Sequence, residues 1–375
     1  MPPGIRRAIG QLLIGSVPGT TIPAELRSLA REFGLGGVTL FARNIEAPEQ
    51  VAELSHDLQS LATGMPLWVA VDQEGGRVAR LRAPFTEWPP MAVLGRSGDP
   101  ALASRFAAAL AAELKAVGIT LDYAPVLDIH TNPKNRVIGD RALAEDAALV
   151  GTLGAAIVVG LQDNGVAACG KHFPGHGDTS VDSHDDLPIV EHPPDRIRRV
   201  ECVPFREAIR ADVAFMMTAH LLVPSLDEEK PATLSRRIVY GLLREELDFD
   251  GVILSDDLEM DALAKNYTAP EAAIEAIAAG CDGVLVCRAR AQDRGQDIEA
   301  QAAVLEALVH AVEDGRIPYK RLEDALSRHR RAKERFLADV GRGMTPRQAG
   351  RKGQAYAVLG CDEHRRIADE MASFL

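Results

Sequence analysis

Short apolar runs rich in β-branched residues alternate along this chain with longer segments in which alanine and leucine recur at helical spacing. The apolar runs are nearly continuous, which is typical of parallel strands that are covered on both faces. The eight runs predicted as strands are 11–15, 36–41, 67–72, 119–125, 166–173, 213–220, 251–257 and 282–287. The predicted helices are 24–33, 48–62, 100–117, 144–162, 194–211, 235–247, 270–279 and 301–312.

Repeated strand–helix units of this kind predict an α/β protein with a (β/α)8 barrel. A doubly wound open sheet is the alternative, but such a sheet usually carries a glycine-rich phosphate loop after its first strand. The segment 16–20, SVPGT, matches such a loop poorly. We expect one barrel domain over residues 1–340, followed over residues 341–375 by a basic linker and a short C-terminal segment.

Composition narrows the class of protein. A net charge of -12 argues against a general nucleic-acid partner, because no broad positive face is available to neutralise phosphates. The five cysteines are scattered and form no CxxC pair, so a reducing compartment is expected rather than a disulfide framework or zinc knuckle. The N-terminus lacks a convincing signal peptide, and the longest apolar stretch, 149–161, is too short to span a bilayer. We expect a cytoplasmic monomer or weak oligomer that binds neither nucleic acid nor membrane.

Polar residues follow several of the predicted strands. Active sites of (β/α)8 barrels lie at the C-terminal ends of the strands, so these side chains are expected to meet on one rim although they are far apart in sequence. They are Asp72, Asp128, the segment 135–141, Lys171, His172, His220, Asp256, Asp257 and Glu259.

The segment 171–188, KHFPGHGDTSVDSHDDLP, is the densest cluster of ionisable groups in the chain. A packed core could not absorb so many without pairing them, because burying a bare charge is costly. Within it Asp182 and His184 are two residues apart, and an aspartate beside a histidine can fix its tautomer and stabilise the imidazolium. The pair is therefore a candidate general acid/base, with a hydrogen bond that braces the loop as the alternative.

A metal site is the main rival interpretation of this segment, although its spacing matches neither HExxH nor a cysteine pattern. The side chains that could ligate a metal there are His172, His176, Asp178, Asp182 and His184.

Asp256 is the first carboxylate after the seventh strand, and it could serve as nucleophile, base or metal ligand. Asp257 and Glu259 are better explained as residues that cap a following helix. Asp72, Arg141, Lys171 and His172 are open to two interpretations. They could bind hydroxyl or carboxylate oxygens of a substrate, or they could pair with one another across the mouth of the barrel.

Four motifs in order over most of residues 10–340 resemble glycoside hydrolase family 3: VAVDQEGGRVARL, APVLDI with VIGDR, KHFPGHGDTSVDSH and GVILSDDLEM. The likeness is to the single-domain bacterial β-N-acetylglucosaminidases of peptidoglycan recycling. It implies Asp256 as nucleophile and His184 as acid/base, paired with Asp182. It also implies retention of configuration and no metal or organic cofactor. The residues that it implies for binding the terminal sugar are Asp72, Arg141, Lys171 and His172.

The expected activity is removal of terminal non-reducing GlcNAc from muropeptides or related N-acetylglucosaminides by an exo-acting β-N-acetylhexosaminidase. A histidine has a reference pKa of about 6.5, so it can supply a proton near neutral pH without a hydrophobic pocket. A histidine also does not repel phosphate, so a phosphorylase that uses the same site is the nearest alternative. A metal-dependent hydrolase and a non-catalytic muropeptide sensor are the remaining ones.

Overall fold

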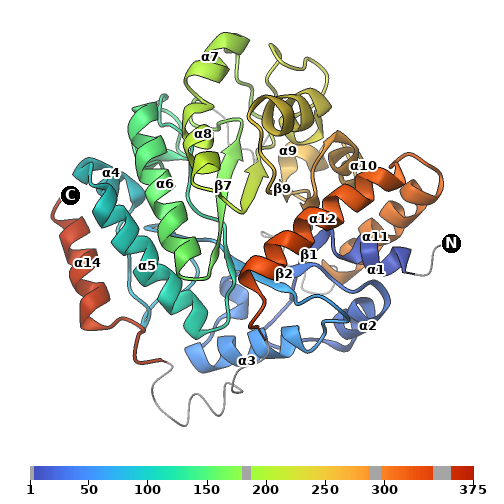
Figure 1. Cartoon of the computed structure of the whole chain (residues 1–375), viewed down its shortest axis with the longest axis horizontal. Coiled ribbons are helices and arrows are strands. Elements are labelled where there is room, and N and C mark those ends of the chain that lie inside the picture. The colour runs from blue at the N-terminus through green and yellow to red at the C-terminus, as the bar shows by residue number, and fades with distance from the viewer. Residues whose placement is uncertain (1–3, 180–186, 288–296, 341–355) are drawn as a thin grey trace.

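The computed structural model describes residues 4–179, 187–287, 297–340 and 356–375 (Figure 1). Parallel strands form a closed barrel in the order β1-β10-β9-β8-β7-β6-β3-β2. Each predicted run overlaps one of these strands, so the prediction of a (β/α)8 barrel is confirmed. The strands are β1 (Leu13–Ser16), β2 (Gly37–Leu40), β3 (Trp68–Val71), β6 (Leu121–Asp122), β7 (Ala167–Phe173), β8 (Phe215–Thr218), β9 (Val252–Asp257) and β10 (Gly283–Leu285).

Some helices of the outer layer begin at a side chain that caps them. Asp99 and Asp146 accept hydrogen bonds from the backbone N–H groups of Ala101 and Leu149, which would otherwise lack partners at a helix start. The helices that follow the barrel strands are α2 (Ala24–Phe33), α3 (Pro48–Gln59), α5 (Pro100–Ala116), α6 (Ala147–Asp163), α7 (Pro194–Arg199), α8 (Val203–Arg210), the π-helix η4 (Arg237–Glu246), α10 (Ala269–Ala279) and α11 (Asp297–Glu313).

The structure corrects one predicted helix, because 194–211 is not continuous. Helix α7 ends at Arg199, and α8 starts at Val203 with Pro204 in its first turn. A proline fits the first turn of a helix, but in a helix interior it removes a hydrogen bond and clashes with the preceding turn.

Several elements were not among the predicted ones. The most important for the site is a two-stranded antiparallel hairpin inserted after β3, which turns at Gly75 and Gly76, both with positive φ. These elements are α1 (Ile5–Gly10), the hairpin strands β4 (Gln73–Gly75) and β5 (Val78–Ala79), α4 (Met91–Ser97), α9 (Asp261–Ala264), α12 (Tyr319–Phe336) and the short 3-10 turns η1 (Ala42–Asn44), η2 (Gly139–Arg141) and η3 (Ala232–Leu234). The short C-terminal segment forms helix α14 (Asp362–Ala372).

The interior of the barrel is filled by side chains, and the end of α12 closes its N-terminal side. Trp68 packs edge-on against Phe215, with ring centroids 5.0 Å apart, and Phe336 lies 6.4 Å from Trp68. Leu337, directly after α12, is buried in the same cluster. The barrel is therefore a packed core with its open, polar face at the other end.

Helix α14 lies beside α4 and α5 (Figure 1). The carboxylate of Glu113 in α5 lies 2.8 Å from Nδ1 of His364 in α14, and it also accepts hydrogen bonds from Thr86. Burial raises the pKa of Glu113, but these hydrogen bonds outweigh it and lower that pKa overall. Glu113 thus ties the last helix to the barrel. Within the described ranges, no helix is long and apolar enough to cross a membrane.

Candidate active site

The polar side chains at the strand ends meet as predicted at the C-terminal rim. Asp72 directly follows β3, and Lys171 lies in β7 on the far side of β6. Nζ of Lys171 donates a hydrogen bond of 2.8 Å to Oδ1 of Asp72, whose other oxygen accepts one of 3.2 Å from Arg80. Residues 99 positions apart in the chain are thereby joined on one face.

Glu74, in the hairpin strand β4, is the residue at this rim that the sequence analysis missed. Arg141 donates two hydrogen bonds to it, of 2.8 Å from Nε and 2.7 Å from Nη2, and Nζ of Lys171 lies 2.6 Å from Oε1. The Glu74 side chain is only 1% exposed. Glu74 and Asp72 are two positions apart, and side chains at that spacing in extended chain point to the same side. This spacing is the signal in VDQEGG that could have revealed it.

The four groups Asp72, Glu74, Lys171 and Arg141 form a network of alternating charges. Burial alone would raise the pKa of both carboxyls, but the neighbouring cations outweigh it, so the pKa values of Asp72 and Glu74 are lowered. Burial would likewise lower the pKa values of Lys171 and Arg141, yet the two carboxylates raise both. All four groups are therefore charged near neutral pH. They pair with one another across the mouth of the barrel, which was one of the two interpretations of these residues. The side chains of Asp72 and Arg141 are nevertheless 20% and 11% exposed at the rim.

An aspartate paired with a histidine lies beside this network. The fully buried Asp128 has Oδ2 2.6 Å from Nδ1 of His172, and its Oδ1 accepts a 2.6 Å hydrogen bond from the backbone N–H of His176. Burial raises the pKa of Asp128, but His172 outweighs this effect and lowers it, so the carboxylate is the acceptor. Nδ1 of His172 therefore carries a proton, which it donates to this carboxylate. Burial lowers the pKa of His176 to about 4, so that ring is neutral.

The last two residues of β9, Asp256 and Asp257, are adjacent carboxylates with different surroundings. Asp256 is half-buried, and its Oδ1 accepts a 2.8 Å hydrogen bond from the N–H of Asp257. Asp257 is buried and accepts hydrogen bonds from the backbone N–H groups of Glu259 and Cys287. The expectation that Asp257 and Glu259 cap a helix was wrong, because α9 starts only at Asp261, with Met260 at its cap position. Asp257 instead holds the start of the loop after β10.

His220, at the end of β8, has both ring nitrogens in hydrogen bonds with the protein. Nδ1 lies 2.8 Å from Oγ1 of Thr233, and Nε2 lies 2.9 Å from the carbonyl oxygen of Asp257. This histidine therefore braces the rim between β8 and β9.

The proposed acid/base pair, Asp182 and His184, lies outside the described residues. Just before it, Nδ1 of His176 lies 2.8 Å from Oγ1 of Thr179, and Asp178 pairs with His192. In the part of the chain that the structure describes, no group of three or more His, Cys, Asp or Glu side chains is placed to hold a metal ion.

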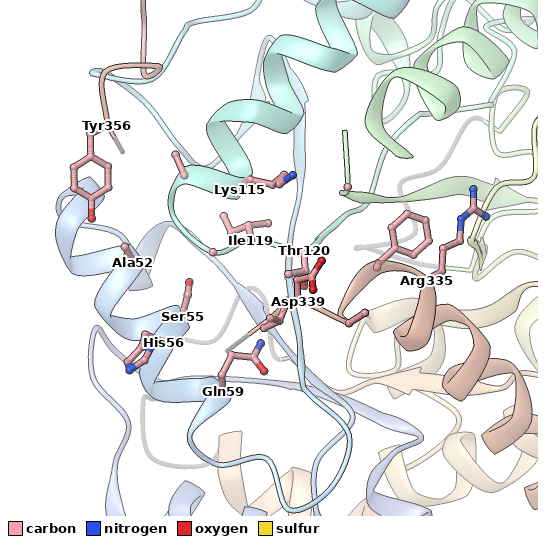
Figure 2. A pocket seen from close by; sticks show the side chains of 16 residues that line it. Ala52, Ser55, His56, Gln59, Lys115, Ile119, Thr120, Arg335, Asp339 and Tyr356 are labelled. Carbon is pink, nitrogen blue, oxygen red and sulfur yellow. The ribbon is translucent and has the colours of Figure 1, made fainter. Parts of the chain in front are cut away.

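A pocket of about 470 Å³ lies at the opposite, N-terminal end of the barrel (Figure 2). Its wall includes Ile119 and Thr120 just before β6, and its ionic side chains, among them Lys115 and Arg335, are exposed. In barrels of this kind the N-terminal face serves stability and the C-terminal face carries chemistry. The rim network is therefore the candidate active site.

The closed barrel with a charged rim defines a TIM-barrel enzyme. The family model for the glycosyl hydrolase family 3 N terminal domain matches residues 4–332, and the chain belongs to this family. Beta-hexosaminidase A of Pseudoalteromonas piscicida is 36% identical over 94% of the chain, which spans 60% of that protein's length. The chain is therefore a family 3 glycoside hydrolase that is similar to the beta-hexosaminidases.

Two solved structures extend this comparison. A family 3 β-N-acetylglucosaminidase from a Paenibacillus species matches 99% of this chain and 68% of its own, with a TM-score of 0.89 and 41% identity. NagZ from Neisseria gonorrhoeae, solved with N-trifluoroacetyl-D-glucosamine, matches 97% of this chain and 98% of its own, with a TM-score of 0.76 and 32% identity.

Proposed function

We propose that this protein is a retaining exo-β-N-acetylglucosaminidase that releases terminal non-reducing GlcNAc from peptidoglycan-derived muropeptides. The observation that carries the proposal is the buried network of Asp72, Glu74, Lys171 and Arg141 on the same rim as Asp256. A fixed set of charged donors and acceptors suits a sugar, because each hydroxyl both donates and accepts hydrogen bonds. The Neisseria structure, whose ligand is an N-acylated glucosamine, supports the choice of sugar.

In the proposed mechanism the carboxylate of Asp256 attacks the anomeric carbon while the bond to the leaving oxygen breaks. His184, paired with Asp182, gives its proton to that oxygen. In the second step His184 takes a proton from water, and the hydroxide formed attacks the anomeric carbon and displaces Asp256. Two displacements at one carbon retain its configuration.

The substrate-binding roles are proposed for Asp72, Arg141, Lys171 and His172. Asp72 would grip hydroxyl groups of the terminal sugar, and the cations would donate to its oxygens. Because Nδ1 of His172 donates to Asp128, Nε2 is the nitrogen that would accept a hydrogen bond from the sugar.

The first test is hydrolysis of 4-nitrophenyl β-N-acetylglucosaminide, with the matching β-glucoside as control, each with and without phosphate. We expect strong preference for the N-acetyl sugar, no effect of phosphate, and β-GlcNAc as the first anomer seen by NMR. Acceleration by phosphate with formation of GlcNAc-1-phosphate would replace the hydrolase with the phosphorylase. No turnover of either sugar would point to a sensor or, with chelator-sensitive activity on another substrate, to a metal-dependent hydrolase.

The natural substrate needs its own experiment. Release of GlcNAc from purified GlcNAc–anhydromuropeptides, compared with chitobiose at equal concentration, would show which aglycone the enzyme prefers. A cytoplasmic location is proposed alongside this substrate, since all five cysteines lie in the described part of the chain as free thiols. Fractionation of cells that express the protein would test it.

A further inference from the structure

We propose that Glu74 is a positioning residue that sets Lys171 and Arg141 for sugar binding without touching the sugar itself. This inference rests on the proposed function. No other carboxylate of the described rim is in contact with both cations: Glu74 meets Arg141 through two hydrogen bonds and Lys171 through an ion pair of 2.6 Å. Its 1% exposure places it beneath the surface that a substrate would touch.

Counting donors shows what Glu74 leaves for a ligand. A lysine ammonium has three N–H donors, and Lys171 directs one to Asp72 and one to Glu74. One donor therefore remains. Of the five N–H donors of Arg141, two bond Glu74 and one bonds the carbonyl oxygen of Val137, so two remain. The direction of each remaining donor is set by the bonds already made to Glu74.

Glu74 is itself held by the hairpin that carries it. The backbone N–H of Gln73 donates a 2.9 Å hydrogen bond to the buried Asp122, and the Gln73 side chain bonds the backbone of Arg80 and Leu81. Both neighbours of Glu74 are therefore fixed, by Asp122 on one side and by the turn at Gly75 on the other. The sequence QEGG thus builds a rigid support for one carboxylate.

The charge of Glu74 matters as much as its shape. Replacing it with glutamine would remove the carboxylate that contacts both cations, and would leave Lys171 bonded to Asp72 and Arg141 bonded to the carbonyl oxygen of Val137. The glutamine amide would also present N–H donors to a guanidinium that needs acceptors, and a buried cation that loses its partner is strongly unfavourable. The two cations should then turn away from their sugar-binding positions.

The test compares Glu74→Gln and Glu74→Asp with the wild type on 4-nitrophenyl β-N-acetylglucosaminide. Misplaced binding groups can reduce rates by about 10²-fold. We expect Glu74→Gln to lower kcat/KM by roughly 10- to 100-fold, mainly through KM. Glu74→Asp, which keeps the charge on a shorter side chain, should recover part of this loss. Glu113→Gln is the matched control, since Glu113 is also a buried, multiply bonded carboxylate but serves α14. It should lower stability and leave KM unchanged.

A second readout separates positioning from general destabilisation. Substrates that lack one ring hydroxyl should lose the binding contributed by Lys171 or Arg141. In the wild type, kcat/KM for at least one deoxy substrate should therefore be much lower than kcat/KM for its parent. This loss, the deoxy penalty, should be smaller in Glu74→Gln. If Glu74 had only a structural role, Glu74→Gln would lower the melting temperature and leave the deoxy penalty unchanged.

The outcomes are distinguishable from failure of the proposed function. If the wild type hydrolyses no N-acetylglucosaminide, the proposed function fails whatever Glu74 does. If the wild type is active and a folded Glu74→Gln protein keeps its kcat/KM within twofold and its deoxy penalty intact, the inference about Glu74 is wrong. If Glu74→Gln does not fold, the same comparison is made on Glu74→Asp, whose unchanged KM would equally overturn the inference.

Discussion

Oδ2 of Asp128 lies 2.6 Å from Nδ1 of His172, and the same carboxylate accepts a hydrogen bond from the backbone of His176. One buried side chain therefore fixes both the tautomer of His172 and the path of the loop that leads to Asp182 and His184. This pair is distinct from Asp182 and His184, the residues proposed as the acid/base pair, which lie outside the described residues.

Changing Asp128 to asparagine tests the role of this pair. The amide can offer N–H to Nδ1 and so favour the wrong ring tautomer, which would remove the hydrogen-bond acceptor on Nε2. We expect kcat/KM to fall by roughly 10- to 100-fold. Asp122→Asn is the matched control, because asparagine keeps a side-chain oxygen that can accept the backbone N–H of Gln73, and burial raises the pKa of Asp122 well above its usual range. Equal losses in the two variants would show that Asp128 has no special part.

The same control makes a prediction about stability. A carboxyl whose pKa is raised in the folded protein binds more protons there than in the unfolded chain, so its ionisation lowers stability as pH rises above the unfolded value near 4. Asp122→Asn removes that loss. Urea unfolding of the variant should therefore give a smaller fall in the free energy of unfolding between pH 5 and pH 8 than the wild type gives. A steeper fall would contradict the raised pKa of Asp122.

Asp256→Ala should abolish turnover while the fold remains intact, because it removes the group that forms the glycosyl-enzyme. A loss on the order of 10³-fold or more is expected, as for other catalytic nucleophiles. Azide at high concentration should partly restore cleavage of the aryl substrate and give a glycosyl azide of inverted configuration, since the small anion can enter the space left by the carboxylate. Near-wild-type turnover by the alanine variant would remove Asp256 from the mechanism.

His184→Ala should show a dependence on the leaving group. A nitrophenolate leaves without a proton, whereas an alkyl or sugar oxygen requires one. We expect the variant to lose far more activity on chitobiose than on 4-nitrophenyl β-N-acetylglucosaminide. Equal losses on the two substrates would argue against protonation of the leaving oxygen by His184.

Lys333, in α12, gives a pH-dependent stability of the opposite sign to that of Asp122. The residue is 2% exposed, and its ammonium donates hydrogen bonds to Oε1 of Gln11 and the carbonyl oxygen of Gly36. Burial lowers the pKa of Lys333 to about 7. Between about pH 7 and the unfolded value near 10.4, the unfolded chain holds more protons, so stability rises with pH.

The slope due to Lys333 cannot exceed about 1.4 kcal/mol per pH unit. Denaturant titrations from pH 7 to pH 10 should show this rise in the wild type and a flatter profile in Lys333→Met. Lys320→Met, at an exposed position of the same helix, should keep the wild-type slope. A wild-type profile identical to that of Lys333→Met would mean that the lysine is not strained by burial.

The barrel and its rim could be predicted because continuous apolar strands and polar strand ends are local patterns. Helix α12 could not be, since its buried face consists of Leu322, Ala325, His329 and Lys333. Two of these four residues are ionisable, so an apolar period is not visible. The hairpin was missed for a related reason: QEGG has no apolar residue, and the charge of the buried Glu74 is compensated by Arg141 and Lys171, which lie far away in the sequence.

The candidate site was predicted only in part. Asp72, Lys171, Arg141 and His172 lie together on the rim as expected, but sequence could not say that Glu74 and Asp128 are the groups that hold them. Their partners are 67, 97 and 44 positions away, and such pairings depend on barrel closure rather than on local spacing. The proposed roles of Asp182 and His184 stay predictions.

The charge network also has a consequence for how the chain folds. A half-barrel that ends after β6 and its following loop would contain Asp72, Glu74 and Arg141 but not Lys171, which arrives only with β7. Asp72 would then keep Arg80 and Glu74 would keep Arg141, but the one cation that contacts both carboxylates would be missing. Closure of the barrel therefore also completes the charge network, so the candidate rim and the complete fold should appear, and be lost, together.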